Sequence, residues 1–280
     1  MPSYDTPEPI SVLLDIYAGH VQVVATDRTT TAVDVRPSDP SDTSDVDTAQ
    51  KTSVDFADGT LMVRGPKRTF DFSKKTRSVD VVIELPTGSK VDLDVTAGSV
   101  RTNGVLGAAE VDLSAGNIHV DRAGSLKADT GAGAVKVGAV TGNAEVKTGS
   151  GHLRVGRVDG ALVVKNSNGH IEVGTVEGAL RARSANGDIH VERAGALVEA
   201  RTAMGAIEVG EVVRDTVTLN TAMGGIEVGI ADGTAAWIDA KTSFGRVSNS
   251  LEGSDGPGSC AETVKVTAHT SFGDISVRRA

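Results

Sequence analysis

Residues able to do acid–base or metal chemistry recur directly after glycines that are 18 residues apart. These residues are His152, His170 and Asp188, and the positions two residues later hold Arg154, Glu172, His190, Glu208 and Glu227. Imidazole and carboxylate side chains on one surface can bind a divalent metal ion or form a general acid–base pair. The candidate catalytic patch therefore consists of His152, His170, Asp188, His190 and Glu172.

The same patch is also typical of a solvated outer face, in which opposite charges pair across neighbouring strands. Each such pair contributes only about 0.2–1 kcal/mol to stability. A flat face has no enclosure that would desolvate a substrate or shift a pKa. We therefore expect no resident metal ion or cofactor, and we retain the patch as the site of an alternative, catalytic function.

Basic residues stand four positions before the glycine in four successive repeats. They are Lys147, Lys165, Arg183 and Arg201, and Arg181 adds to their charge. Like charges stacked in register repel one another, so Glu145 and Glu199 are expected to offset part of the excess. The pattern fits either a solvated face or a basic stripe that binds an anionic partner, such as an acidic protein surface or a polyanion.

Nucleic acid is not expected as that partner. No aromatic side chains that could stack on bases are interleaved with the stripe. The formal net charge of the chain, −9, also opposes nonspecific binding to a nucleic-acid backbone.

The glycines that order these rows define a repeat. They are Gly98, Gly116, Gly133, Gly151, Gly169, Gly187, Gly205, Gly224, Gly245 and Gly273, at intervals of 17 to 28 residues. Apolar residues alternate with polar ones on both sides of each glycine, as in β-strands that face a core. One repeat cannot bury its apolar face, but stacked copies can. The sequence thus predicts an all-β, single-chain parallel β-solenoid with a coil of about 18 residues, in which Ile171, Ile189 and Ile207 form one interior column.

The residue before each corner glycine changes systematically along the chain. It runs Ala97, Ala115, Ala132, Ser150, Asn168, Asn186, Met204, Met223, Phe244 and Phe272. Stacked asparagines are expected to form a ladder of side-chain amides. The Met and Phe pairs are expected to pack in the core of coils that widen toward the C-terminus, or else to line a pocket.

The first third of the chain carries the repeat in a degraded form. Val12–Val23 contains a corner glycine with apolar residues at the expected positions, whereas Pro37–Lys51 is rich in Asp, Ser and Thr and indicates an exposed loop. Residues 1–88 are expected to be an irregular N-terminal β cap with the first coils, and residues 89–280 the solenoid repeats.

The other end of the stack has no such cover in the sequence. The final coil, Val264–Val277, is expected to be the last of the stack and to leave an open strand edge. We therefore expect self-association through this C-terminal coil, most simply as a two-fold dimer.

Composition excludes several other classes of protein. The 280 residues include 33 glycines but a single cysteine, Cys260, so an intramolecular disulfide and a cysteine-only zinc site are excluded. Cys260 lies in a Gly/Ser/Pro-rich stretch and is expected to be incidental. The chain starts without a basic segment or a long apolar run, so we expect no secretion signal, no membrane span and a cytoplasmic location.

Several segments resemble one known family. They are the strand Asp15–Val21, the lead-in Leu85–Gly88, the repeated Gly-x-(Ile/Val)-x-Val core and the C-terminal segment Thr263–Ile275. This pattern resembles the bacterial β-strand-repeat family called "putative adhesin", domain of unknown function 4097, over nearly the whole chain. The resemblance implies the fold and brings no set of catalytic residues, and the adhesin label implies an exposed location.

These observations favour a non-catalytic β-solenoid that acts as a scaffold or protein-interaction module with a protein partner. The alternative is a β-helix enzyme that acts on a polysaccharide or peptide through the His/Asp/Glu patch. The repeats carry a single insertion, near Ser250–Cys260, so the long loops that wall a polysaccharide-binding groove are missing.

Overall fold

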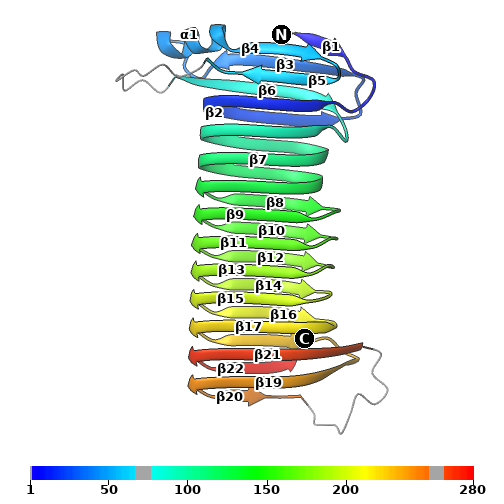
Figure 1. Cartoon of the computed structure of the whole chain (residues 1–280), viewed down its shortest axis with the longest axis vertical. Coiled ribbons are helices and arrows are strands. Elements are labelled where there is room, and N and C mark those ends of the chain that lie inside the picture. The colour runs from blue at the N-terminus through cyan, green and yellow to red at the C-terminus, as the bar shows by residue number, and fades with distance from the viewer. Residues whose placement is uncertain (1, 67–76, 252–261) are drawn as a thin grey trace. The chain divides into compact units, whose positions relative to one another are not determined.

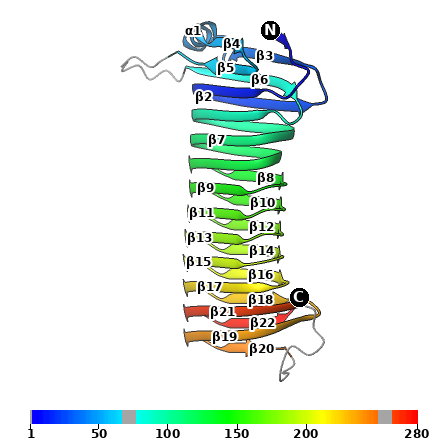
Figure 2. The same ribbon diagram turned by 45° about the vertical axis from the view of Figure 1, so that its right-hand side comes forward.

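The computed structural model describes residues 2–66, 77–251 and 262–280 of the chain. Figures 1 and 2 show stacked β-strands, and α1 (Thr43–Lys51) is the one helix in the described ranges. The chain forms two compact units, Met1–Gly138 and Ala139–Ala280. Strands of successive coils pair in parallel in both units, so the predicted all-β, parallel β-solenoid is confirmed.

In the unit Ala139–Ala280, each coil contributes one strand to each of two parallel stacks (Figure 1). The first stack consists of β9 (Ala144–Ser150), β11 (Leu162–Asn168), β13 (Leu180–Asn186), β15 (Val198–Met204), β17 (Asp215–Met223), β21 (Glu262–Phe272) and β19 (Thr234–Phe244). The second consists of β10 (Leu153–Val158), β12 (Ile171–Val176), β14 (Ile189–Ala194), β16 (Ile207–Val212), β18 (Ile226–Ile230), β22 (Ile275–Arg279) and β20 (Val247–Asn249). Paired residues from β9 to β15 are 18 positions apart, as predicted.

Columns of aliphatic side chains fill the interior of this unit. Ile171, Ile189 and Ile207 pair in register and are fully buried, which confirms the predicted column. A second column in the other stack contains Ala144, Leu162 and Leu180. Since each of these residues is covered by its counterparts in the neighbouring coils, the repeat itself produces the burial.

A glycine at each corner lets consecutive coils approach to hydrogen-bonding distance. Gly187 has a φ of +134°, which L-residues rarely adopt. A Cβ atom at Gly187 would lie 2.2 Å from the carbonyl oxygen of Gly169 in the preceding coil. The 18-residue spacing of the glycines is therefore a steric requirement of the stack.

The inside of each corner is filled three residues before the glycine. Thr202 and Thr221 donate hydrogen bonds to the carbonyl oxygens of Gly187 and Gly205, at 3.1 and 2.9 Å. Asn166 does the same for Gly151 at 2.9 Å. These are the last inward-facing side chains of their strands, because the chain must turn at the next residues.

As a consequence, the residue directly before the glycine points outward. The expectation that the Met and Phe pairs pack in a widening core is wrong, since Met204, Met223, Phe272 and Phe244 are 50%, 54%, 54% and 67% exposed. The inward-facing Thr or Asn already occupies the corner. The predicted amide ladder is confirmed on the outside: Asn186 Nδ2 donates to Asn168 Oδ1 at 2.9 Å.

The last coils do not follow chain order. β21 pairs in parallel with β17 on one side and with β19 on the other, and β22 lies between β18 and β20. Figures 1 and 2 both show the C-terminal strands between coils that precede them in sequence. The expectation that Val264–Val277 forms the open end is therefore wrong: the end coil is β19–β20.

The unit Met1–Gly138 shows the same kind of insertion. Its strands are β1 (Ser3–Asp5), β2 (Ser11–Thr26), β3 (Thr30–Pro37), β4 (Ser53–Ala57), β5 (Thr60–Arg64), β6 (Ser78–Pro86) and β7 (Lys90–Ala132), and β8 (Val135–Val140) spans the division between the units. β2 lies between β7 and the strands β5 and β6, with Gly19 opposite Gly98 as the repeat predicts. β1, β3 and β4 add antiparallel pairings. The boundary between residues 88 and 89 stays a prediction.

The expected loop at Pro37–Lys51 is wrong in its second half, which forms α1. Asp42 is the N-cap, and its side chain accepts a hydrogen bond from the Ser44 N–H at 2.7 Å. Buried Asp45 accepts the Ser78 N–H at 2.8 Å and so ties α1 to β6. No helix among the described residues is long and apolar enough to span a membrane.

Candidate functional site

The predicted basic stripe forms on the first stack of the unit Ala139–Ala280. Lys147, Lys165, Arg183 and Arg201 stand in register on β9, β11, β13 and β15. Neighbouring strands are about 4.8 Å apart, so the four cations form a line at that spacing. Arg181 lies on β13 next to Arg183 in the outer face.

Two carboxylates offset part of this charge, as predicted. Glu199 contacts three guanidinium groups, those of Arg181, Arg183 and Arg201, at 3.6, 3.2 and 3.3 Å. Glu145 contacts Lys147 at 2.9 Å and Lys165 at 3.6 Å. The hydrogen bond from Lys147 lowers the pKa of the Glu145 carboxyl below its ordinary value.

The stripe keeps a positive excess and a shallow hollow. Five cations face two carboxylates among the stripe residues just named, which leaves three positive charges. A hollow of about 280 Å³ lies among Glu145, Val163, Val164, Lys165, Arg181 and Arg183. Beyond Arg201 the same column continues through Asn220, His269 and Lys241, in the order that the inserted β21 imposes.

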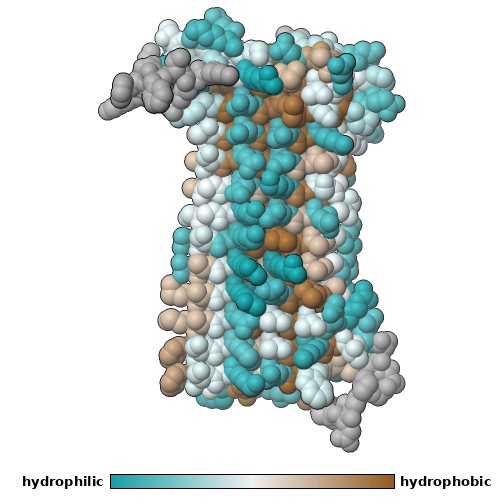
Figure 3. All heavy atoms as spheres, in the orientation of Figure 1, coloured by the Kyte–Doolittle hydropathy of each residue, from teal (hydrophilic) through white to brown (hydrophobic). Residues whose placement is uncertain are grey.

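An exposed apolar ridge lies beside the stripe on the same stack. We use this name for Met204, Met223, Phe272 and Phe244, which stand in register in that spatial order. The rings of Phe244 and Phe272 stack with centroids 4.9 Å apart and an interplanar angle of 6°. Figure 3 shows tan and brown spheres along the left margin at the level of the lower strands. The sequence interpretation missed this surface because it assigned these residues to the core.

The ridge and the stripe are close because Met204 follows Arg201 by three positions on β15. Three residues of a strand span about 10 Å. A partner that lies across the ends of β13, β15 and β17 can therefore contact guanidinium groups and thioether or phenyl side chains at once.

The structure brings the histidine patch together in pairs. The rings of His152 and His170 stack at 5.4 Å. His170 Nδ1 lies 3.2 Å from Asp188 Oδ2, and His190 Nδ1 lies 3.1 Å from Glu208 Oε2. Glu172 contacts Arg154 at 3.5 Å instead of a histidine. These pairs could exchange a proton, but the rings and carboxylates lie on an exposed face.

Backbone contacts give part of this patch a role in the stack. Asp188 Oδ1 accepts the Ala206 N–H of the next coil at 2.8 Å. Asn117 and Asp274, which also follow corner glycines, accept equivalent N–H groups at 2.9 and 2.8 Å. His170 Nδ1 lies 3.2 Å from the Asp188 N–H, so it can accept this hydrogen bond or donate to the carboxylate, but not both at once. The proposed chemistry of the patch stays a prediction.

An acidic ladder occupies the equivalent column in the unit Met1–Gly138. Asp15 stands opposite Asp94, and Asp92 and Asp112 lie nearby. Burial and then the charge of Asp15 raise the pKa of Asp94. Burial and then the charge of Glu110 raise the pKa of Asp92. The environment of the ladder therefore disfavours the ionised carboxylates of Asp92 and Asp94.

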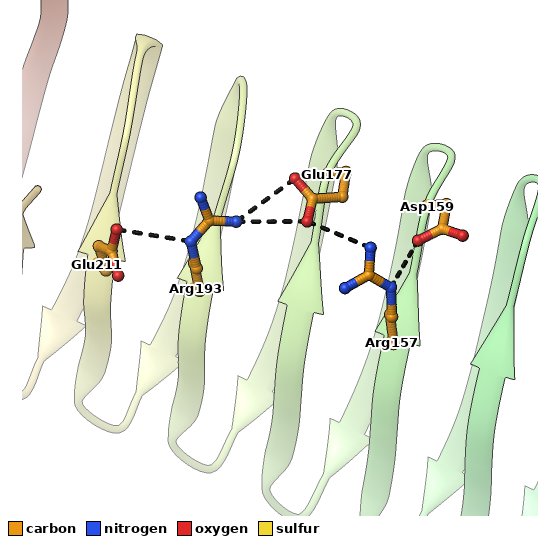
Figure 4. Close-up of polar contacts among 5 residues, drawn as sticks. All are labelled: Arg157, Asp159, Glu177, Arg193 and Glu211. Carbon is orange, nitrogen blue, oxygen red and sulfur yellow. Dashed lines mark hydrogen bonds and ion pairs between the residues drawn. The ribbon is translucent and has the colours of Figure 1, made fainter.

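A network of ion pairs crosses four coils at the other corner of the unit Ala139–Ala280 (Figure 4). Arg157 contacts Asp159 at 2.7 Å and Glu177 at 3.5 Å. Arg193 contacts Glu177 at 3.3 Å and Glu211 at 3.5 Å. Because these charges pair with one another, this corner stabilises the stack and offers no uniform charge to a partner.

Among residues 2–66, 77–251 and 262–280, no three His, Cys, Asp or Glu side chains form a group that could hold a metal ion. Cys260, and with it the expectation that its thiol is incidental, lies outside the described residues.

Fold and surface together define a class: a glycine-cornered β-solenoid with charged rows on its outer face. Within that class, residues 13–278 match the model of the family described as Toastrack DUF4097. The chain belongs to this family, and the resemblance stated from the sequence is confirmed. No curated protein matches the chain.

Two solved structures are similar over almost their whole length. One is described as a "putative adhesin" from Bacteroides fragilis, with 15% identity, 99% of this chain and 95% of that chain covered, and a TM-score of 0.36. The other is described as a "putative cell adhesion protein" from Clostridium sporogenes, with 10% identity, coverage of 100% and 98%, and a TM-score of 0.21. Likenesses at these values carry no argument about function.

Proposed function

We propose that the chain is a non-catalytic binding module that holds a partner protein against the basic stripe and the apolar ridge. The observation that carries this proposal is that both surfaces lie on the first stack and meet at β15, which carries Arg201 of the stripe and Met204 of the ridge. Lys165, Arg183 and Arg201 form a line of cations, and Met204 and Met223 stand at the ends of β15 and β17. The partner is accordingly an acidic segment that also presents apolar side chains.

The ridge favours protein over the other polyanions. Covering exposed methionine and phenylalanine side chains with apolar surface stabilises a complex by about 25 cal/mol per Å² of apolar area buried. An acidic peptide can supply that surface between its carboxylates. Nucleic-acid and polysaccharide backbones cannot, and the stripe itself has no interleaved aromatic rings for base stacking.

Binding of a fluorescein-labelled peptide of Glu and Leu, followed by anisotropy, tests the proposal. We expect Lys165→Glu with Arg183→Glu to weaken binding by roughly 30-fold, since attraction becomes repulsion at two surface contacts worth ~0.5–1 kcal/mol each. Met204→Ser with Met223→Ser should weaken binding of the same peptide but leave binding of an oligoglutamate peptide unchanged.

The matched control is Arg154→Glu with Arg278→Glu, which changes the net charge equally but lies on β10 and β22 of the second stack. If the stripe variant and this control lose equal affinity for the peptide, the loss comes from the change in net charge alone, and the proposed site is refuted. If heparin binds more tightly than the peptide and the stripe variant weakens both, the partner is a polyanion and the proposal of a protein partner is wrong. The cytoplasmic location stays a prediction that cell fractionation would test.

A further inference from the structure

In the part of the chain that the structure describes, the end coil, β19–β20, leaves a strand edge and part of the core open. Among the described residues, β19 pairs with β21 alone and β20 with β22 alone. Ile238 and Ala240 are half-buried, whereas their neighbours in register, Val266 and Ala268, are fully buried. The interior columns therefore end at β19 without the covering residues that every earlier coil has.

The backbone groups at this edge can be assigned from the register. The N–H groups of Leu162 and Leu180 donate to the coil that follows, each at 2.8 Å. Ile238 stands in the same column as Leu180, through Val198, Val217 and Val266. Because residues of a parallel strand alternate in direction, Ile238, Ala240 and Thr242 direct their N–H and C=O groups away from β21.

We propose that a second copy of this chain pairs with this edge, β19 against β19, antiparallel around a two-fold axis. A two-fold axis across the end of the stack reverses the strand direction, and antiparallel pairing satisfies both sets of backbone groups. β19 has 11 residues and β20 has 3, so the pairing of β19 with itself joins the longest edges.

The charges on β19 select the register. Centred on Ala240, the pairing places Asp239 of each copy opposite Lys241 of the other, and this occurs twice. Centred on Asp239 or on Lys241, it would place like charges directly opposite, which is destabilising. In the register centred on Ala240, Ile238 meets Thr242 of the second copy, so the two cores become continuous.

The exposed indole supports the same arrangement. Trp237 is 73% exposed and stands on the outer face of β19 with Asp239 and Lys241. In the proposed register it lies opposite Ser243 of the second copy, a small side chain that the indole can cover. None of the stripe residues lies on β19, so this interface can form or fail without changing the stripe, whereas the ridge residue Phe244 ends the paired strand.

Charge exchange between copies tests the pairing. We expect sedimentation to show a dimer for the unmodified chain at micromolar concentration. Asp239→Lys or Lys241→Asp alone creates two like-charge contacts per dimer and should weaken dimerisation by about 10- to 100-fold. An equimolar mixture of the two variants restores both opposite pairs and should form heterodimers, identified by a mass difference between the two chains.

The control is Arg154→Glu, which lies on β10 and should stay dimeric. Circular dichroism checks that each variant is folded. A monomeric unmodified chain would refute the proposal. Dimers of both single variants as stable as those of the unmodified chain, or the absence of heterodimers in the mixture, would refute this edge or its register.

Discussion

Replacing the corner glycine Gly187 by alanine should destabilise the stack far more than an ordinary glycine substitution. The new Cβ atom would lie 2.2 Å from the carbonyl oxygen of Gly169, and the φ of +134° is already strained for any L-residue. The strain alone costs ~1–2 kcal/mol. To relieve the contact, the two coils must separate at the corner, which weakens the hydrogen bonds from Gly169 to Asn186 and from Ile171 to Asp188, both at 2.9 Å.

Each of these hydrogen bonds is worth about 1 kcal/mol, so the expected loss in the free energy of unfolding is ~3–4 kcal/mol. For a chain of this size the midpoint temperature should fall by roughly 6–15 °C. Urea and thermal unfolding followed by circular dichroism measure both quantities.

The matched control is Gly233→Ala. Gly233 also has a positive φ, +76°, but no atom of the described residues lies within 4 Å of the position of its Cβ. This variant should lose ~1 kcal/mol through conformation alone. If Gly187→Ala lowers the free energy of unfolding no more than Gly233→Ala does, the close approach of the coils does not require glycine at the corners. The steric explanation of the glycine spacing is then wrong.

Three further substitutions test the interior, the corner and the acidic ladder. Ile189→Asp buries an unpaired carboxylate in the column and should cost more than ~4 kcal/mol, so that circular dichroism shows an unfolded chain; a folded variant with an unchanged midpoint would contradict the register. Thr221→Val removes the hydrogen bond to the Gly205 carbonyl and should cost ~1–2 kcal/mol in urea unfolding, whereas Thr218→Val on the outer face should cost little. Asp94→Asn should stabilise the chain by ~0.2–1 kcal/mol at neutral pH. The folded-state pKa of Asp94 is raised, so the ionised carboxylate opposes folding above that pKa, and the stabilisation by Asp94→Asn should vanish as the pH falls through it. Urea unfolding at neutral and at acidic pH measures this stabilisation, and an equal value at both would contradict the proposed cause.

The interior of the fold could be predicted from the sequence because it follows from local spacing. Glycines 18 residues apart and alternating aliphatic residues determine which positions face inward, and the predicted column through Ile189 is confirmed. The stripe and its offsetting carboxylates, Glu145 and Glu199, follow from the same register.

The order of the end coils could not be predicted in this way. Every coil presents a similar edge, so the sequence does not specify that β17 pairs with β21 and not with β19. The long intervals before Gly245 and Gly273 were the available indication that these coils differ.

The ridge was missed for a different physical reason. Alternation stops at Thr202 and Thr221, whose side chains bond to the corner carbonyls, and the two residues that follow are both exposed. A pattern of strict alternation cannot represent that break. α1 was missed because its N-cap, Asp42, lies in a stretch of polar residues without an apolar period.

Carbodiimide cross-linking to the Glu/Leu peptide, mapped by mass spectrometry, tests most directly the claim that the stripe is the binding surface. The reagent joins a lysine amine to a carboxylate that touches it. We predict cross-links at Lys147 and Lys165, and none above background at Lys265, which lies on β21 seven positions before the ridge residue Phe272. Cross-links spread evenly over all of these lysines, or absent from Lys147 and Lys165, would contradict the account.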